Sequence, residues 1–328
     1  MSITAHELAL KCGVSRGSVD RALKGRPGIN PQTRDKILEA AKEYDYRPNF
    51  IGQALSSGRT KTIGIVIFDF RHSFFAELYS AFEHEADIFN YVSLPMLSYH
   101  EPEREMECIR RLVDRNVDGL IILPVNRGEE YENFLKSLKI PVVCIGNRLS
   151  AEFPFSGIDD RQAAHDAADY LADKGCERIY YYCPPVENKK SANIYAQEQR
   201  LAGYEEGLAA NQFKGEAITN QEKLLEHLEH FSGNDNVAVM CSNDFYALEL
   251  QILFRDRHPD LYNRVKIMGF DGLDVLRFSI PAIPSVAFSR KTWALKAFGQ
   301  IFNMLSGKTV ADEIIAHSII ETMQQEFK

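Results

Sequence analysis

The feature that most constrains the fold is a repeated alternation of short apolar runs and amphipathic helical segments over residues 62–328. The apolar runs of strand length are residues 62–68, 119–125, 140–146, 178–183, 237–242 and 265–271. Segments with helical periodicity, such as residues 74–89, 160–174 and 244–257, separate them. Uniformly apolar strands that alternate with helices are typical of parallel sheets covered on both faces. We therefore expect an α/β body.

The length of this body predicts two lobes rather than one sheet, because single doubly wound domains are usually shorter. Open parallel sheets bind ligands beyond the carboxyl ends of their strands. Asn243 directly follows one apolar run, Asp271 ends another, and Asp160 follows the short strand-like stretch SGID. Carboxylate and amide groups at such positions can exchange hydrogen bonds with neighbouring hydroxyl groups. These residues favour a small sugar or polyol as the ligand.

Aromatic side chains complete the candidate ligand site. Phe74 or Phe75 can cover the apolar face of a sugar ring, and Phe288 is a further candidate. Each of these residues can also have a purely structural role. Asp160 and Asp244 can cap the helices that follow them, and Phe74 and Phe75 can belong to the core.

The first 61 residues differ from the rest in charge. They hold 11 Lys and Arg against 6 Asp and Glu, a net charge of +5, whereas the remainder holds 27 against 40, a net charge of -13. A basic segment ahead of an acidic body is typical of a module that binds a polyanion, attached to a part with another task.

Capping signals divide the basic segment into three short helices. Thr4 and Glu7 form a capping box that starts the first helix at Ala5, which ends near Gly13. Ser15 caps a second helix over residues 16–24, closed by Gly25. Asn30, with Pro31 at the first helical position, starts the third.

The second helix has one apolar and one polar face. The apolar face is formed by Val19, Ala22 and Leu23. The opposite, polar face is formed by Gly17, Asp20, Arg21 and Lys24, with Arg16 beside them at the first turn. Two helices joined by a tight turn, the second presenting arginines, form a helix-turn-helix that reads the major groove of DNA.

Arg16 and Arg21 can each donate two hydrogen bonds to a guanine, a contact worth about 1–3 kcal/mol of discrimination. Gly17 has no side chain and permits a close approach of the backbone. The alternative is a helical hairpin with merely solvated charges, which Asp20 favours because a carboxylate repels phosphates unless it is neutralised.

Composition excludes several other classes. No apolar run reaches about 18 residues and no signal peptide pattern opens the chain, so we expect a cytoplasmic protein without membrane contact. The six cysteines show no CxxC pair, and the nine histidines show no metal-ligand spacing. We therefore expect neither a metal nor a cofactor, and solvated positions for His84, His100 and His317.

An enzyme on a doubly wound fold needs a phosphate-binding loop, a nucleophile elbow or a metal motif. The chain contains no GxGxxG after a strand and no GxxxxGK[ST], GxSxG or HExxH. We expect no catalytic residues. A free-standing sugar carrier remains the rival to a regulator, because the body alone would suit one.

The stretch ITAHELALKCGVSRGSVDRALKGRPGINPQTRDKILEAAKEYDYRPNFIGQALSSGRTKTIGIV, residues 3–66, closely resembles the LacI/GalR (lactose repressor/galactose repressor) family of bacterial transcription regulators. The similarity continues through the body. It implies a helix-turn-helix headpiece at residues 1–48, a hinge helix and linker at 49–60, and an effector-binding and dimerisation domain at 61–328.

The resemblance assigns roles by position. Arg16, Gly17 and Arg21 fall where the family reads operator bases, although relatives usually carry a bulkier polar residue at Gly17. Leu55, in the hinge-like stretch PNFIGQALSSG, falls where the family inserts a leucine into the minor groove. Residues expected at phosphates or in the minor groove are Ser15, Ser18, Lys24, Asn30, Thr33 and Leu55.

For the body, the resemblance implies a periplasmic-binding-protein-like fold of two doubly wound lobes. The first lobe is expected at about 61–161 and 291–320 and the second at about 162–290, with chain crossings near 161, 290 and 320. QRLAGY at residues 199–204 matches a family segment in which an arginine grips the sugar, here Arg200. Many relatives carry an Asp-Arg pair where this chain has Asn147-Arg148.

These features predict a sequence-specific regulator, a repressor, that binds a pseudo-palindromic operator in double-stranded DNA as a homodimer. One headpiece reads too few base pairs for specificity in a genome, which is the reason for expecting two. A small sugar or polyol between the lobes would control operator affinity.

Overall fold

The computed structural model of the chain describes residues 3–47, 52, 54–55, 58–183, 192–231 and 236–321. The chain forms two compact units, Met1–Lys61 and Thr62–Lys328, which are treated separately below and are called the headpiece and the body.

Residues 3–47 of the headpiece form three helices, α1 (Ala5–Cys12), α2 (Arg16–Leu23) and α3 (Pro31–Glu43). Their ends follow the predicted capping signals. The Oγ1 of Thr4 accepts a hydrogen bond from the backbone N–H of Glu7, whose carboxylate accepts one from the backbone of Thr4 in return. Gly13 ends α1 in the left-handed conformation, with φ at +68°. The predicted helix boundaries are thus confirmed to within a residue or two.

A small apolar core joins these helices. Leu8 from α1, Val19 from α2 and Ile37 from α3 are completely or almost completely buried against one another. The apolar face predicted for α2 therefore points inward, and its polar face is left to the solvent.

The predicted hinge at residues 49–60 lies largely outside the described residues. Among those that are described, Leu55 has a side chain that is 83% exposed. Leu55 is therefore not part of an apolar core.

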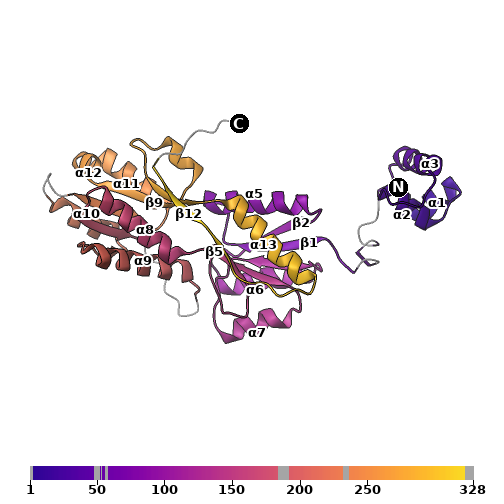
Figure 1. Ribbon diagram of the computed structural model, residues 1–328, viewed down its shortest axis with the longest axis horizontal. Coiled ribbons are helices and arrows are strands. Elements are labelled where there is room, and N and C mark those ends of the chain that lie inside the picture. The colour runs from indigo at the N-terminus through magenta and orange to yellow at the C-terminus, as the bar shows by residue number, and fades with distance from the viewer. Residues whose placement is uncertain are drawn as a thin grey trace. The chain divides into compact units, whose positions relative to one another are not determined.

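The body contains two six-stranded sheets, one in each lobe (Figure 1). The first has the order β11 (Glu313–Ile315), β5 (Phe155–Ile158), β4 (Val142–Ile145), β3 (Gly119–Ile122), β1 (Thr62–Ile67) and β2 (Val92–Leu97). All its neighbouring strands are parallel, and β1 pairs with β2 from Thr62 opposite Val92.

The second sheet has the order β12 (His317–Ile320), β10 (Ser285–Phe288), β9 (Lys266–Asp271), β8 (Val237–Cys241), β6 (Arg178–Tyr182) and β7 (Ala217–Ile218). Only β12 runs antiparallel among these described strands, with Ile320 opposite Ser285. The expected α/β class with two parallel-sheet lobes is confirmed.

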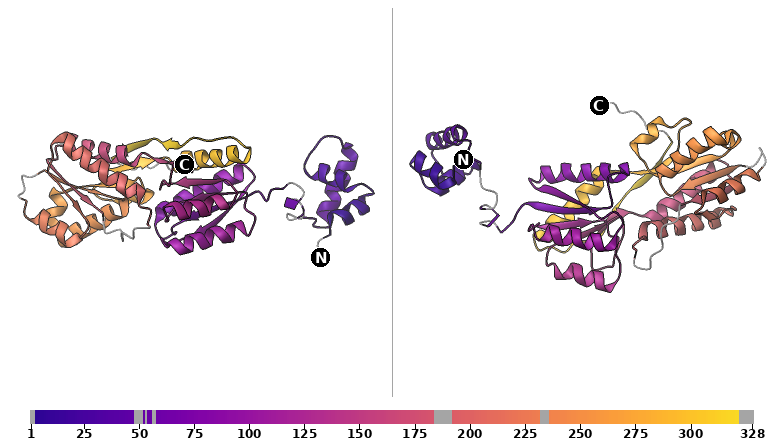
Figure 2. Two further views of the ribbon diagram at one scale, coloured as in Figure 1. Left: turned by 90° about the horizontal axis from the view of Figure 1, so that it is seen from below. Right: turned by 180° about the vertical axis from the view of Figure 1, so that it is seen from behind.

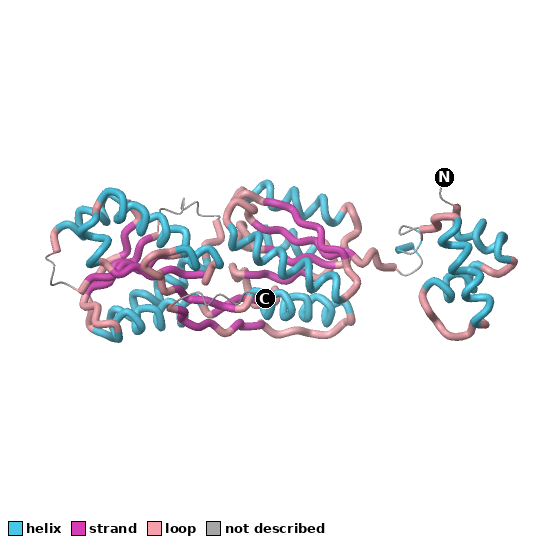
Figure 3. Tube along the Cα trace, turned by 90° about the horizontal axis from the view of Figure 1, so that it is seen from above, coloured by secondary structure: helices cyan, strands magenta, loops and turns pink. Residues whose placement is uncertain are grey.

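Helices cover both faces of each sheet (Figures 2 and 3). In the first lobe, α5 (Ser73–Ile88) and α13 (Arg290–Leu305) cover one face, and α6 (Pro102–Val113) and α7 (Glu129–Ser137) the other. Alternation along β1 explains this arrangement, because Ile63 and Ile65 pack toward α5 and α13 whereas Val66 packs toward α6.

In the second lobe, α8 (Asp160–Asp173) and α9 (Tyr195–Asn211) cover one face. The other face is covered by α10 (Gln221–Glu229), α11 (Asp244–Arg257) and α12 (Pro259–Arg264). A short 3-10 helix, η1 (Asp274–Phe278), follows β9. None of the helices within the described ranges is both long and apolar enough to cross a membrane.

Three chain crossings link the lobes. The first two lie between β5 and α8 and between β10 and α13, close to the expected positions of 161 and 290. The third lies at residue 316, between β11 of the first sheet and β12 of the second, rather than near 320. The boundary differs because β12 pairs with β10, so residues 317–320 belong to the second lobe.

Candidate functional site

The polar face of α2 is the candidate DNA-binding surface of the headpiece. Arg16, Gly17 and Arg21 are all exposed there, as is Lys24 at the end of the helix. The guanidinium groups therefore remain accessible to a macromolecule that docks on this face.

Asp20, which argued against DNA binding, is neutralised within the headpiece. One of its carboxylate oxygens lies 2.6 Å from Nζ of Lys24, and the other lies 3.6 Å from a guanidinium nitrogen of Arg26. Its charge is thus balanced by local cations, and it does not oppose the approach of a phosphate backbone in the way that an isolated carboxylate does.

Gly17 has no packing role inside the headpiece. A Cβ atom at this position would meet only Oγ of Ser15, at 3.6 Å, which is ordinary van der Waals contact. Glycine in a helix costs about 1 kcal/mol relative to alanine, and nothing in the described headpiece explains that cost. The glycine leaves the exposed face of α2 without a side chain at this position.

The residues expected at phosphates lie around the ends of α2 and α3. Ser15 caps α2 by accepting a hydrogen bond from the N–H of Ser18, and Asn30 caps α3 by accepting one from the N–H of Gln32. Thr33 is half-buried in the first turn of α3. The serine, asparagine and threonine groups therefore lie near helix N-termini, where backbone N–H groups also attract anions.

A cavity of about 390 Å³ in the body is the candidate ligand site. It lies at the carboxyl ends of the strands of both sheets, and residues of both lobes line it. All seven residues expected at the effector line this cavity, namely Phe74, Phe75, Asp160, Arg200, Asn243, Asp271 and Phe288. These residues lie up to 214 positions apart in the chain. The strand-end rule had selected Asp160, Asn243 and Asp271, and the family resemblance had selected Arg200.

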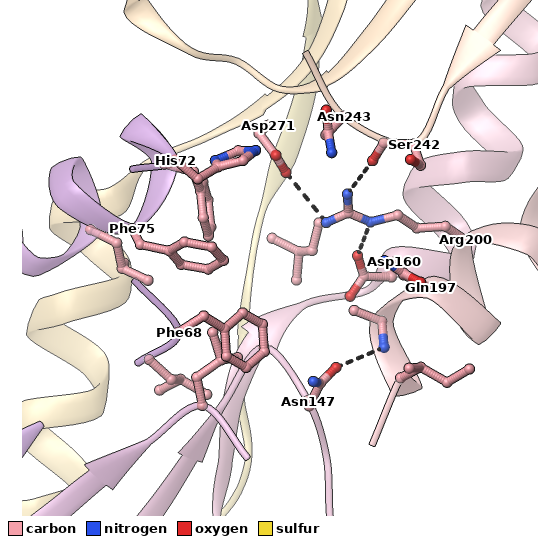
Figure 4. A pocket seen from close by; sticks show the side chains of 18 of the residues that line it. Phe68, His72, Phe75, Asn147, Asp160, Gln197, Arg200, Ser242, Asn243 and Asp271 are labelled. Atoms are coloured by element: carbon pink, nitrogen blue, oxygen red, sulfur yellow. Dashed lines mark hydrogen bonds and ion pairs between the residues drawn. The ribbon is translucent and has the colours of Figure 1, made fainter. Parts of the chain in front are cut away.

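Arg200 is the centre of the polar wall (Figure 4). Its Nε donates to Oδ1 of Asp160 at 2.7 Å, and its Nη1 donates to the backbone oxygen of Ser242 at 2.7 Å. Its Nη2 lies 3.4 Å from Oδ1 of Asp271. The guanidinium also lies 3.7 Å above the ring centroid of Phe270. Burial opposes the charge, but Asp160 and Asp271 outweigh it and raise the pKa of Arg200.

The position of Asp271 is set by unusual backbone geometry. Its φ is +105°, a conformation that non-glycine residues rarely adopt and that costs about 1–3 kcal/mol. Arg290 donates from Nη2 to the backbone oxygen of Asp271 at 3.0 Å and helps to hold this turn. Burial raises the pKa of the Asp271 side chain to about 6, although Arg200 acts to lower it.

The structure removes the capping alternative for Asp160 and Asp244. Asp159 and Asn243, not Asp160 and Asp244, are the N-caps of α8 and α11. Asp160 is therefore free to bind Arg200. Asp244 lies below the cavity and accepts hydrogen bonds from the N–H of Leu273 and the hydroxyl of Ser285.

The first lobe supplies an aromatic wall opposite Arg200 (Figure 4). Phe68 and Phe75 meet edge to face with their ring centroids 5.1 Å apart. His72 lies 4.3 Å from Phe245 of the second lobe, ring centroid to centroid, and burial lowers its pKa to about 4. His100 is exposed, as expected, although its ring also packs on Phe68 with the ring centroids 3.9 Å apart. The expectation of a solvated position is wrong for His317, whose side chain is only 15% exposed and pairs with Asp166 at 2.8 Å.

Asn147 connects the two lobes at one edge of the cavity. Its Nδ2 donates to the backbone oxygens of Pro124 and Asn193, at 3.2 and 3.0 Å, and its Oδ1 accepts from the N–H of Ala196 at 3.1 Å. Arg127 and Glu198 add an ion pair between the lobes at 3.3 Å. The residue in the loop that departs from the family pattern therefore holds the lobes in their present arrangement.

Sequence reasoning missed several residues of the cavity wall. Phe68 directly follows β1, so it could have been predicted as a residue at the carboxyl end of a strand. Gln197 lies one turn before Arg200 on α9 and was detectable from helical spacing. His72 and Trp293 carry no local signal, because they enter the cavity only through the packing of α5 and α13. The missed side chains include Phe68, Asp69, His72, His100, Asn147, Gln197, Tyr246 and Trp293.

A headpiece with an exposed basic recognition helix, followed by a two-lobed body with a ligand cavity, defines a class of bacterial DNA-binding regulators. A family model described as periplasmic binding proteins and sugar binding domain of LacI family matches residues 60–313. A second, described as bacterial regulatory proteins, lacI family, matches residues 4–49. The chain belongs to the LacI family of transcription regulators, which places it with regulators and not with enzymes or free-standing carriers.

Curated relatives agree with this assignment. The chain is 27% identical over 319 residues to catabolite control protein A of Priestia megaterium, covering 96% of each chain. It is 28% identical over 293 residues to catabolite control protein A of Staphylococcus epidermidis, covering 87% of each. It is 26% identical over 332 residues to the HTH-type transcriptional regulator RegA of Clostridium saccharobutylicum, covering 98% of each.

Solved structures share the fold along nearly the whole chain. The lac repressor dimer bound to operator and the anti-inducer ONPF has a TM-score of 0.83 at 18% identity, with 98% of each chain covered. The complex of the transcriptional regulator CelR with cellobiose has a TM-score of 0.67 at 20% identity, covering 98% of this chain and 100% of that one.

Proposed function

We propose that this chain is a cytoplasmic transcriptional repressor that binds a pseudo-palindromic operator as a homodimer, and that a small sugar or polyol in the cavity controls its affinity for DNA. Arg16 and Arg21 read bases from the major groove, and the glycine between them allows the backbone of α2 to approach the duplex. Ser15, Ser18, Lys24, Asn30 and Thr33 contact phosphates. Leu55 enters the minor groove.

The observation that carries the ligand assignment is the pairing of Arg200 with two carboxylates. Arg200 is the one Lys or Arg side chain among the described residues of the cavity wall, and Asp160 and Asp271 balance its charge. The site therefore offers no unpaired cation to a phosphate. It offers carboxylate oxygens to hydroxyl donors, with aromatic rings opposite, and this combination suits an uncharged polyol.

The amide of Asn243 and the rings of Phe74, Phe75 and Phe288 complete the ligand contacts. Two proteins of this fold were solved with sugars: a periplasmic binding protein/LacI transcriptional regulator from Alkaliphilus metalliredigens with D-xylulofuranose, and CelR with cellobiose. These ligands support a sugar as the class to test first.

Ligand control needs unequal affinity for two arrangements of the lobes. Because residues of both lobes line the cavity, a ligand that contacts both favours one lobe angle over the other. The body supplies the dimer contacts, so a change of lobe angle alters the spacing of the two segments that lead to the headpieces.

Trp293 allows a direct test, because it is the only tryptophan of the chain and lines the cavity. Full-length protein is screened by tryptophan fluorescence and thermal shift against neutral sugars, polyols and their phosphate esters. We expect a neutral compound to bind and its phosphate ester to bind at least about tenfold more weakly, a difference of 1.4 kcal/mol. Preferential binding of the phosphate esters would contradict the proposal.

A further inference from the structure

Arg290, the first residue of α13, lies directly behind the wall of the ligand cavity. Its guanidinium carbon is 5.6 Å from the ring centroid of Phe74 and 5.9 Å from that of Phe288. Its Nη2 donates to the backbone oxygens of Asp271, at 3.0 Å, and Gly272, at 3.3 Å. Phe74, Phe288 and Asp271 all line the cavity, whereas Arg290 is not among the described residues that do. Arg290 can therefore influence a bound ligand only through these neighbours.

We propose that Arg290 is a positioning residue of the ligand site, which holds Asp271 in place from the first lobe and, together with Glu77, links ligand contact at Asp271 to helix α5. This inference rests on the ligand binding proposed above. It adds to that function a route by which the position of the first lobe reaches the ligand.

The turn that carries Asp271 requires support from its surroundings. Asp271 has a φ of +105° and Gly272 a φ of +61°, so two successive residues adopt conformations that L side chains rarely occupy. Such backbone persists only where neighbouring contacts hold it. On the side of the second lobe, the N–H of Gly272 donates to the hydroxyl of Ser285 at 3.1 Å. The two carbonyl groups are held by Arg290, so the first lobe supplies part of the support.

Glu77 connects Arg290 to α5. Its Oε2 lies 3.1 Å from Nε of Arg290, and the two side chains are 26% and 15% exposed. One guanidinium thus joins a carboxylate of the first lobe to backbone carbonyls of the second. A rotation between the lobes that separates these neighbours lengthens one of the contacts. A ligand that fixes Asp271 therefore favours the position of α5 in which both contacts are intact.

Arg290 also acts on the charge of Asp271. Burial raises the pKa of Asp271 to about 6, and Arg200 and Arg290 act to lower it. Removal of Arg290 should therefore raise the pKa of Asp271 further. The other charged and titratable groups around Asp271 and Arg290 lie on neighbouring elements, namely Asp160 of α8, Arg200 of α9, Asp244 of α11, Glu77 of α5 and Asp274 of η1.

The test measures the pH dependence of sugar affinity in full-length Arg290→Met by calorimetry, with the sugar identified in the Trp293 screen. We expect the midpoint of the profile to move from about pH 6 to about pH 7, because the cation no longer favours the carboxylate of Asp271. A residue that merely supports the fold would leave this midpoint unchanged. Lys291→Met is the matched control, since Lys291 is the next residue of α13 and is exposed; its profile should be that of the wild type.

Two further variants separate charge from geometry. Arg290→Gln, which keeps an amide donor for the carbonyls, is a second uncharged variant and should show the same upward movement of the midpoint. Arg290→Lys keeps the charge but not the planar fork of donors, so we expect weaker binding with a midpoint near that of the wild type. Circular dichroism verifies that each variant is folded.

The link to α5 is tested with Glu77→Gln, alone and combined with Arg290→Met. If the pair acts as one unit, the double variant should change its DNA affinity in response to the sugar no less than Arg290→Met alone does. Additive losses of this response in the two single variants would show that Glu77 and Arg290 act independently, and would overturn the link.

A last measurement needs no ligand. The contribution of Asp271 to the pH dependence of unfolding is obtained by comparing each protein with its Asp271→Asn derivative in urea. This contribution should be lost as the pH rises through about 6 in the wild type, and through about 7 in Arg290→Met. A wild-type protein that binds no sugar would contradict the proposed function and leave this measurement to decide on Arg290. An Asp271 midpoint that stays at its wild-type value in both uncharged variants would overturn the inference.

Discussion

The headpiece and the body keep their functional groups in opposite environments. In the headpiece, the side chains of Arg16 and Arg21 stand exposed over a small core, and the unit is basic. In the body, the side chains of Asp160, Arg200 and Asp271 are only 3%, 14% and 7% exposed, and the unit is acidic. The exposed face of α2 is formed by neighbouring residues of one helix. The cavity, in contrast, is lined by residues of both lobes that lie far apart in the chain.

This difference determines how a substitution acts. An exposed arginine has little desolvation to overcome and contributes little to folding, so its loss affects binding alone. A buried arginine between two carboxylates has been removed from water together with them. Its loss leaves uncompensated charges and affects stability as well as binding.

The largest expected effect is on the stability of the body in Arg200→Met. Removing the guanidinium leaves Asp160 and Asp271 buried without their partner, so the free energy of unfolding should fall by about 3–5 kcal/mol. Urea denaturation followed by the fluorescence of Trp293 measures this in the body alone, since no other tryptophan exists. Arg161→Met, which removes an exposed ion pair with Glu206, should cost less than about 1 kcal/mol. Equal losses of unfolding free energy in the two variants would contradict the distinction between a buried and an exposed arginine.

Next in size is the effect of Leu8→Ala on the headpiece. Leu8 is fully buried in a core of few residues, so its truncation should cost about 2–5 kcal/mol and unfold much of the headpiece. DNA binding should then be lost while the Trp293-monitored unfolding of the body stays unchanged. Leu10→Ala is the control on the same helix, because Leu10 is 67% exposed and should be tolerated. A parallel loss of body stability in Leu8→Ala would show that the two units do not fold independently.

A smaller effect is expected for Arg16→Ala, confined to DNA recognition. Loss of a two-pronged contact with guanine should reduce discrimination at one base position by about 1–3 kcal/mol and leave the stability of both units unchanged. Binding to a fragment selected from a random library, and to its single-base variants, measures this at several salt concentrations. Lys42→Ala, at the far end of α3, is the control. Uniform weakening on all sequences would assign Arg16 to phosphates instead.

The smallest effect is the pH dependence of ligand binding. Asp271 accepts hydrogen bonds from a ligand best as a carboxylate, and its pKa is about 6 in the folded chain. Affinity should therefore fall by about tenfold as pH drops from 7.5 to 5. His72, with a pKa of about 4, stays neutral over this range. Asp271→Asn should bind weakly with a flat profile, and a flat profile in the wild type would exclude Asp271 from ligand contact.

The stability of the ligand-free body should change in the opposite direction. The pKa of Asp271 is raised on folding, so the folded state favours the protonated form. This contribution is fully present below a pH of about 4 and is lost as the pH rises through about 6. Asp244, whose pKa is raised to about 8 by burial, acts in the same sense at higher pH.

Most of the headpiece was predictable because its determinants are local. The capping box at Thr4, the glycine that ends α1 and the proline that starts α3 each act within a few residues. The fully apolar strands of the body were equally visible. Strand β2 was not singled out, because Pro95 interrupts its sequence. Proline has no backbone N–H to donate, and the structure accommodates it on an edge strand that pairs with β1 on one side only.

The cavity was predictable only in part. Residues at strand ends, such as Asn243 and Asp271, were found because parallel sheets gather their carboxyl ends at one edge. His72 and Trp293 were missed because their positions depend on how two helices pack, which no local pattern encodes.

The central claim is that a ligand in the body changes how the headpiece binds DNA. The most direct measurement is the affinity of the full-length protein for its selected DNA fragment, with and without a saturating sugar identified through Trp293. We predict a change of about 5–150-fold in the wild type. Asp271→Asn, which binds the sugar weakly, should show a much smaller change at the same sugar concentration and should still bind DNA. An unchanged DNA affinity in wild-type protein shown to be saturated with that sugar would contradict the account.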